Sequence, residues 1–402
     1  MKRPLIILFV LTFLTGSCRH KASTSAETEK EVVIAKMDGQ TEAIEDSIKK
    51  ANALSLQAQF KRVVYPKAQT QPVDQQHDID AADDPAIWYN AENPGESRVL
   101  GTDKQAGLAL YNLKGELVDF QSVGRVNNVD LRYNFPHNDQ KIAIAAASER
   151  NLNALMLFSV TADSLSIVHT KPALLDSFII DDAYGCCMYY SRKKDTFYAF
   201  IGGKNGNIQQ WKLESDAGKI SIEAVRTISL ASQSEGMVAD DETGILYIAE
   251  EGNAIWKTDA EEDGSNELTK LADSDSLNTH IAYDLEGLDI YYAGDGKGYL
   301  IASVQGNFSY AVFEKHGNNK YLGNFIIRAN NSIDGAEETD GLAVSNLNMG
   351  PDFPNGLLVV QDGFNEENNQ PRPQNFKLID WADVSKSFND PLIISPDYKW
   401  WK

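Results

Sequence analysis

The feature that most constrains the fold of this chain is an internal repeat. A unit of two β-type runs, separated by a polar or glycine-containing break, occurs six times. The units begin roughly 50 residues apart, which is the period of propeller blades built from four strands each. The six copies lie at 99–111, 142–158, 197–211, 246–256, 299–310 and 357–379.

This repeat predicts an all-β fold. Gly, Asn and Asp turns separate short β-rich runs, and no long amphipathic helical pattern interrupts them. A single blade cannot bury both of its faces, so the six copies must close into a ring. A β-sandwich is the alternative architecture, but it does not explain a repeat of this period. We therefore expect a six-bladed β-propeller over residues 73–402, preceded by a short tether or helix.

Residues 1–18 have the pattern of an export signal. Two basic residues precede an apolar run from Leu5 to Leu14, which is too short to span a bilayer, since spanning takes about 20 residues. Small residues then lead into Cys18, the pattern of a bacterial lipobox in which the cysteine is lipidated. Two interpretations stay open: a lipoprotein of the cell envelope (periplasm or outer membrane), held to a membrane only through Cys18, or a plain secretory signal. Both export the protein.

Residues 19–72 are expected to form a tether. Their first part is polar and flexible in composition. Residues 43–62 carry apolar side chains at near-helical spacing, which fits either a helix or a solvated linker. Further along, Cys186 and Cys187 are neighbours in an apolar stretch, and adjacent cysteines rarely bridge. We expect both to be small core residues.

The net charge of −21 limits the partners of the protein. Nucleic acid is not expected, because a phosphate backbone requires clustered Lys and Arg. An acidic protein that binds a polyanion needs a cation to supply positive charge, and clustered carboxylates hold hard cations. The 6 histidines are scattered along the chain, which disfavours zinc.

Polar clusters precede the repeat units in phase with one another. Equivalent positions of successive blades surround one axis, so these clusters should meet at one mouth of the central channel. The clusters are Asp83-Asp84, Asn127-Asn128, Asp181-Asp182 with Tyr184, Ser234-Glu235, Asp284 with Glu286, and Thr339-Asp340.

A second in-phase set falls at the end of the next strand. Its members are Lys104, Arg150, Lys204, Glu250-Glu251, Gln305 and Asp362. The charges are sorted, with bases on the first three copies and mainly acids on the last three. Carboxylates together with an amide such as Asn128 favour Ca²⁺, while Lys and Arg favour phosphate oxygens. Glu250 should point away from the mouth, because neighbouring side chains in a strand alternate.

At these residues the sequence resembles the β-propeller phytases, over residues 78–381. The similar motifs are DDPAIW at 83–88, NNVDLRY at 127–133, LYIAEE at 246–251, DLEG at 284–287, GYLIAS at 298–303 and QDG at 361–363. The resemblance implies a calcium-dependent 3-phytase, a phosphoric monoester hydrolase acting on myo-inositol hexakisphosphate (phytate) or its calcium complex. Several calcium ions are expected, and the protein is expected to be a monomer.

The resemblance also implies roles for individual residues. It places the catalytic calcium cluster at Asp83, Glu235, Glu251, Asp284, Glu286 and Asp340. It assigns contacts with the phosphate being cleaved to Lys104, Arg150, Tyr184 and Lys204. It assigns the binding of structural calcium to Asp84, Asp334 and Asp362. It assigns contact with a neighbouring phosphate, which is not cleaved, to Gln305. Direct attack by a metal-activated water is expected, because neither a Ser-His-Asp set nor a Cys phosphate loop is visible.

Two other classes of protein remain as alternatives. A calcium-dependent, lactonase-like esterase would also use a propeller with a calcium mouth, but it has no need of three cationic side chains beside the metal. A non-catalytic propeller that binds a partner has no reason to sort the charges around its mouth. Tyr184, finally, either contacts phosphate or packs in the core.

Overall fold

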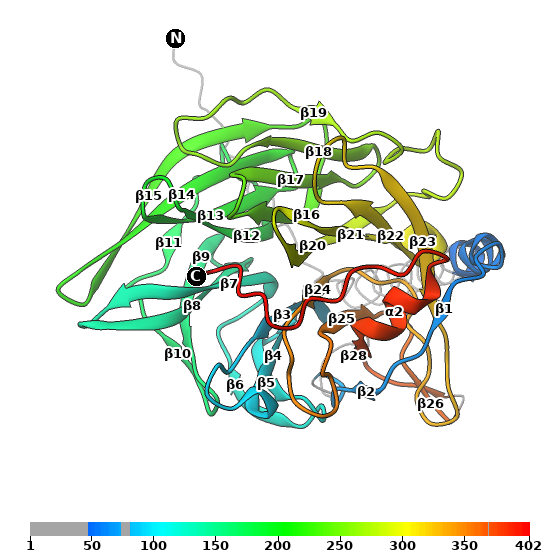
Figure 1. The fold of residues 1–402 in the computed structure, drawn as a ribbon. Helices are drawn as coiled ribbons and strands as arrows, with labels where there is room; N and C mark the ends of the chain where they lie inside the picture. The colour runs from blue at the N-terminus through cyan, green and yellow to red at the C-terminus, as the bar shows by residue number, and fades with distance from the viewer. Residues whose placement is uncertain (1–46, 74–80, 369) are drawn as a thin grey trace, which may run out of the picture. The chain divides into compact units, whose positions relative to one another are not determined.

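The computed structural model describes residues 47–73, 81–368 and 370–402. The chain divides into compact units of residues 1–52 and 53–402. Among the described residues, the second unit contains six sheets of four or five strands, which are the six predicted blades (Figure 1). The all-β, six-bladed propeller is thus confirmed.

The first three blades follow the chain from the inner to the outer strand. Blade 1 consists of β3 (Ala82–Trp88), β4 (Arg98–Asp103), β5 (Gly107–Asn112) and β6 (Leu117–Gln121). Blade 2 consists of β7 (Val126–His137), β8 (Gln140–Glu149), β9 (Ala154–Val160) and β10 (Leu165–Ile167), with β11 (Ala173–Leu174) also pairing with β9. Blade 3 consists of β12 (Ala183–Ser191), β13 (Thr196–Gly203), β14 (Asn207–Asp216) and β15 (Lys219–Ser229).

The last three blades continue the same order. Blade 4 consists of β16 (Ser234–Asp240), β17 (Ile245–Glu250), β18 (Ala254–Asp259) and β19 (Thr269–Lys270). Blade 5 consists of β20 (Leu285–Gly294), β21 (Lys297–Val304), β22 (Ser309–Glu314) and β23 (Tyr321–Ile327). Blade 6 contains β24 (Leu342–Ser345), β25 (Leu357–Asp362) and β28 (Asn375–Asp380). Shorter elements are η1 (Pro94–Glu96), η2 (Gln305–Asn307), the hairpin β26 (Glu366–Glu367) with β27 (Gln370–Pro371), and α2 (Trp381–Ser387).

The innermost strands close the ring. Each of β3, β7, β12, β16, β20 and β24 contacts the next one, and β24 contacts β3 again. The middle strands are buried on both faces because blades stack on either side. In β17, Leu246 and Ile248 pack toward blade 3, while Tyr247 and Ala249 pack toward blade 5.

Blade 6 is completed by the N-terminal segment. Strand β2 (Ala68–Gln69) pairs with β28, with Ala68 opposite Leu378. Strand β1 (Val63–Val64) adds a parallel edge to β23 of blade 5. Strands of the propeller sheets thus lie within the segment 19–72 that was expected to be a tether. Strands of two residues show no periodicity in a sequence.

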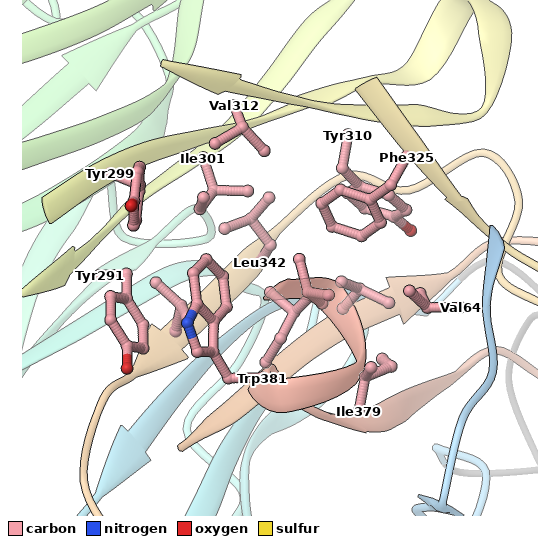
Figure 2. Packing of buried hydrophobic residues seen from close by; sticks show 14 of the residues in the cluster. Val64, Tyr291, Tyr299, Ile301, Tyr310, Val312, Phe325, Leu342, Ile379 and Trp381 are labelled. Atoms are coloured by element: carbon pink, nitrogen blue, oxygen red, sulfur yellow. The ribbon is translucent and has the colours of Figure 1, made fainter. Parts of the chain in front are cut away.

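Aromatic residues fill the space between blades 5 and 6. Trp381, at the start of α2, is fully buried and stacks on Tyr291 with ring centroids 4.0 Å apart. Figure 2 shows its ring beside Tyr291 and below Ile301. The helix begins here because the Asp380 carboxylate accepts a hydrogen bond from the Ala382 N–H, a typical N-cap. Sequence analysis did not identify this short helix.

A β-bulge recurs in the inner strands. It lies at the same point of β3, β7, β12, β16 and β20, and bulges redirect side chains next to functional sites. In blades 3 to 5 the second bulge position is glycine. A Cβ added to Gly236 would lie 1.9 Å from the Glu286 carbonyl oxygen, so only glycine permits this approach between blades.

The C-terminal residues lie at the other end of the channel. A cavity of about 80 Å³ between the inner strands is bordered by Trp400 and Trp401. The Trp400 ring stacks on Tyr292 at 4.8 Å and lies 5.3 Å from the Arg132 guanidinium carbon. Arg132 lies four residues and Tyr292 five residues beyond the bulges along their strands, toward the far end of the channel.

The remaining predictions concern the N-terminus and the cysteines. Residues 47–57 are helical, within the stretch 43–62 that was expected to form either a helix or a linker. The export signal and Cys18 lie outside the described residues. Within the described part of the chain, no helix has the length and apolar character needed to cross a membrane. Cys186 and Cys187 are buried free thiols.

Candidate metal and phosphate site

The first residues of the bulges form a ring of polar side chains at one mouth of the channel. We call this set the inner ring; blade 6 contributes to it from the position just before β24. Its members are Asp83, Asn127, Tyr184, Glu235, Glu286 and Asp340. The predicted convergence of distant polar clusters is therefore present in the structure.

The residues that follow the second strands form an outer ring. Strand register gives its members as Lys104, Arg150, Lys204, Glu251, Gln305 and Gly363. Asp362 was expected here, but it aligns with Glu250 instead. Both accept backbone N–H groups of nearby turns: Glu250 from Ser232, and Asp362 from Glu337.

Three inner- and outer-ring carboxylates meet closely. Glu235, Glu251 and Glu286 are buried, and each offers an oxygen within 4.8 Å of the others. Burial, followed by the charges of Glu235 and Glu251, raises the pKa of Glu286 well above its ordinary value. Among the described residues, Glu251 Oε1 and Glu286 Oε2 find no hydrogen-bond donor. Such oxygens are suited to a divalent cation.

Asp340 and Asp83 extend this acidic half and join it to a base. The Lys104 ammonium lies 3.2 Å from Asp340 Oδ2 and 3.5 Å from Asp83 Oδ2. Gln305 donates to Asp340 Oδ1 at 2.6 Å. Burial, then the charge of Asp340, raises the pKa of Glu235. Lys104 thus contacts an acid of its own blade, Asp83, and an acid of the neighbouring blade 6, Asp340.

Glu251 is influenced by two residues that directly precede inner strands. Gln233, before β16, donates its side-chain amide to Glu251 Oε2. Asp284, before β20, adds its negative charge to the effect of burial, and both raise the pKa of Glu251. All six acids expected in the catalytic calcium cluster are therefore brought together, whereas Gln233 was not identified from the sequence.

The cationic half of the site is built around Tyr184. The Lys204 Nζ lies 4.7 Å from the centre of the Tyr184 ring, and the Arg150 guanidinium carbon lies 5.9 Å from it. Burial, then the charges of Glu235 and Glu286, raises the pKa of Tyr184, so its hydroxyl remains a neutral hydrogen-bond donor.

Asn127 connects the cationic and acidic halves. Its Oδ1 accepts from Arg150 Nη1 at 3.2 Å, and its Nδ2 donates to Glu235 Oε1 at 2.5 Å. Asn128 was the residue of this pair predicted to bind metal. The signal that could have identified Asn127 is its alignment with Glu235 as first residue of the bulge.

Asp84 and Asn128 lie next to these residues on the channel wall. Asp84 Oδ2 accepts the Val129 N–H at 3.0 Å. Burial raises the pKa of Asp84, although that hydrogen bond lowers it. The Asn128 N–H donates to Ser148 Oγ.

Asp334 and Asp362 belong to a different cluster around Lys377, whose side chain is fully buried. Lys377 Nζ pairs with Asp334 and lies 3.0 Å from Asp362 Oδ2. It also donates to Gln69 Oε1 at 2.7 Å and Asn365 Oδ1 at 3.0 Å. Burial raises the pKa of Asp362 to about 7 even though the ammonium lowers it.

A propeller mouth that combines buried carboxylates with cationic side chains defines a class of protein able to hold divalent cations and phosphate in one place. Comparison with known proteins identifies the class more closely. The Phytase family model matches residues 31–400. A 3-phytase of Bacillus subtilis (strain 168) is 43% identical over 315 residues, covering 77% of this chain and 82% of that protein. The chain belongs to the phytase family, and the protein is a phosphoric monoester hydrolase.

Proposed function

We propose that the protein is a calcium-dependent phytase that removes phosphate from myo-inositol hexakisphosphate by direct attack of water. The single observation that carries the proposal is the juxtaposition of two oppositely charged groups at one mouth. Glu235, Glu251 and Glu286 offer oxygens within 4.8 Å of one another, and Lys204 and Arg150 flank Tyr184 beside them.

The acidic cluster fits calcium in its donor set. All of its ligands are oxygens, and two of the buried oxygens have no hydrogen-bond donor among the described residues. Asp83, Glu235, Glu251, Asp284, Glu286 and Asp340 would hold the cations, with Asp84 and Asn128 as further oxygen ligands on the channel wall. Calcium bound there would offset the repulsion between carboxylates and phosphate and lower the pKa of the attacking water.

The protein's own residues then bind and orient the phosphate. The Arg150 fork and the ammonium groups of Lys104 and Lys204 receive its oxygens. The neutral Tyr184 hydroxyl donates a hydrogen bond to the same group. These cationic donors stabilise the charge that develops on the phosphoryl oxygens during displacement. Gln305 donates to a phosphate beside the one being cleaved.

Calcium at Asp334 and Asp362 remains a separate prediction. Lys377 already supplies positive charge to both carboxylates, so a divalent ion is not required for charge balance there. Export through the N-terminal signal, with lipid attachment at Cys18 as the anchoring form, is part of the same proposal, as is the choice between free phytate and its calcium complex as substrate.

Phosphate release from phytate tests the function. Full-length protein is assayed with excess chelator, then with calcium or magnesium restored, beside a lactone and a simple carboxylic ester. We expect release only with calcium and no ester or lactone cleavage. Undiminished release in chelator would refute calcium dependence, and calcium-dependent lactone cleavage without phosphate release would favour the esterase alternative.

A further inference from the structure

Asp182, directly before β12, forms an ion pair with Arg150 to which the proposed phosphate site gives no role. Arg150 Nε donates to Asp182 Oδ1 at 3.1 Å, and Arg150 Nη2 donates to Asp182 Oδ2. This is a two-armed ion pair between adjacent blades, because Arg150 follows β8 of blade 2. Paired N–H groups fix the plane of a guanidinium as well as its position.

The Asp182 carboxylate is itself anchored through its neighbour. The Asp182 N–H donates to Asp181 Oδ1 at 2.9 Å, and the same oxygen accepts the Asn205 N–H at 3.1 Å. Asn205 directly follows Lys204. One two-residue segment therefore ties down the backbone beside Lys204 and the side chain of Arg150.

The position of Asp182 also acts on the outer ring in other blades. Asp182, Gln233 and Asp284 are each the last residue before an inner strand. Asp284 acts through its charge on Glu251 of the preceding blade, as Asp182 pairs with Arg150 of the preceding blade, whereas Gln233 hydrogen-bonds to Glu251 of its own blade. In these three blades the residue before the inner strand therefore influences an outer-ring side chain.

Arg150 needs such control because it lies between opposing attractions. Its Nη1 already reaches Asn127, which bridges to Glu235, and the charge of Asp83 also acts on it. Without the Asp182 carboxylate, the Arg150 guanidinium would turn toward the carboxylates that are proposed to bind cations. Asp182 pairs with two of its nitrogens away from that cluster.

We infer that Asp182 is a positioning residue that holds Arg150 in the orientation needed to receive the substrate phosphate. This inference rests on the proposed phytase function. An alternative explanation predicts the opposite change in KM. If Asp182 acted only through its negative charge, its removal would make the mouth more attractive to a polyanion, and KM would fall.

The test uses the full-length protein with saturating calcium and phytate. Asp182→Asn keeps the size but removes the charge and one arm of the fork. We expect kcat/KM to fall roughly tenfold or more, because small displacements of a positioned group have large effects on rate. Inhibition by inorganic phosphate should weaken by a similar factor, while the calcium concentration for half-activation stays unchanged. Asp182→Glu should recover part of the loss.

Two further variants separate positioning from damage to the fold. Asp176→Asn removes an equal charge from an exposed position of the same connecting segment and should leave all parameters unchanged. In a double-mutant cycle, Asp182→Asn should have little additional effect once Arg150→Lys is present. Additive effects, or a lower KM in Asp182→Asn, would overturn the inference. Absence of phytate hydrolysis by the wild type would instead refute the proposed function.

Discussion

Replacing Glu286 by glutamine should change stability in opposite directions with and without calcium. The Glu286 carboxylate is buried beside Glu235 and Glu251, with oxygens within 4.8 Å of one another. At an effective dielectric constant near 20, each like-charge pair at that distance costs about 3.5 kcal/mol. The raised pKa of Glu286 follows from burial and from these charges.

Protonation limits this cost in the calcium-free protein. Keeping the carboxyl protonated costs about 1.36 kcal/mol for each pH unit above its ordinary pKa of 4.5. The buried carboxyl group therefore lowers the free energy of unfolding by at most about 3.4 kcal/mol at pH 7 and about 0.7 kcal/mol at pH 5. Because burial and neighbouring charges raise the pKa of Glu286 in the folded state, wild-type stability falls as pH rises from 4.5 toward that raised pKa, whereas the glutamine variant does not titrate.

Calorimetry in chelator is the assay. We expect Glu286→Gln to raise the melting temperature by about 4 to 6 °C at pH 7, taking roughly 2 °C per kcal/mol, and by much less at pH 5. With calcium at about 1,000 times its dissociation constant, the wild type gains roughly 4.1 kcal/mol per bound ion, which exceeds the cost of the buried carboxyl group, and the order should reverse. The exposed Glu223→Gln serves as the control. If Glu286→Gln melted at a lower temperature than the wild type in chelator at pH 7, the proposed repulsion between the three carboxylates would be refuted.

Three other predictions follow from the structure. Glu235→Gln should abolish phosphate release without changing the circular dichroism spectrum, and normal turnover would contradict its place in the catalytic cluster. Trp381→Ala should cost about 3 to 5 kcal/mol in unfolding free energy, because it empties a buried aromatic site; Trp381→Phe should cost clearly less in the same denaturant titration. Lys377→Met should cost about 3 to 5 kcal/mol by leaving Asp334 and Asp362 without their ammonium. An unchanged melting temperature for Lys377→Met would show that these carboxylates do not depend on the lysine.

The repeat predicted the ring and most of its mouth because both follow from spacing alone. Equivalent positions of six similar units must surround one axis, so Glu235 and Glu286 could be placed together without coordinates. What spacing cannot supply is the strand register. Asp362 was assigned to the outer ring because it is the polar residue nearest to the right position, but the residue in register is Gly363, which has no side chain to reveal it.

The bulge explains the other omission at the site. In a regular strand, alternation decides which of two neighbours faces the mouth, but a bulge breaks that alternation. Asn127 and Asn128 were therefore equivalent in the sequence, and only pairing with β8 distinguishes them. Strand β2 was missed for a different reason: two residues carry no periodicity, and their partner β28 lies about 300 positions away.

That distant pairing has a consequence for how the molecule is made. A chain synthesised from its N-terminus carries β2 as an unpaired edge until Leu378 and its neighbours exist. Contacts so far apart in sequence form late, because the loop entropy is lost before the contact is gained. Blade 6 should therefore assemble last, and until then the growing protein exposes a free edge to which other unfinished chains can attach.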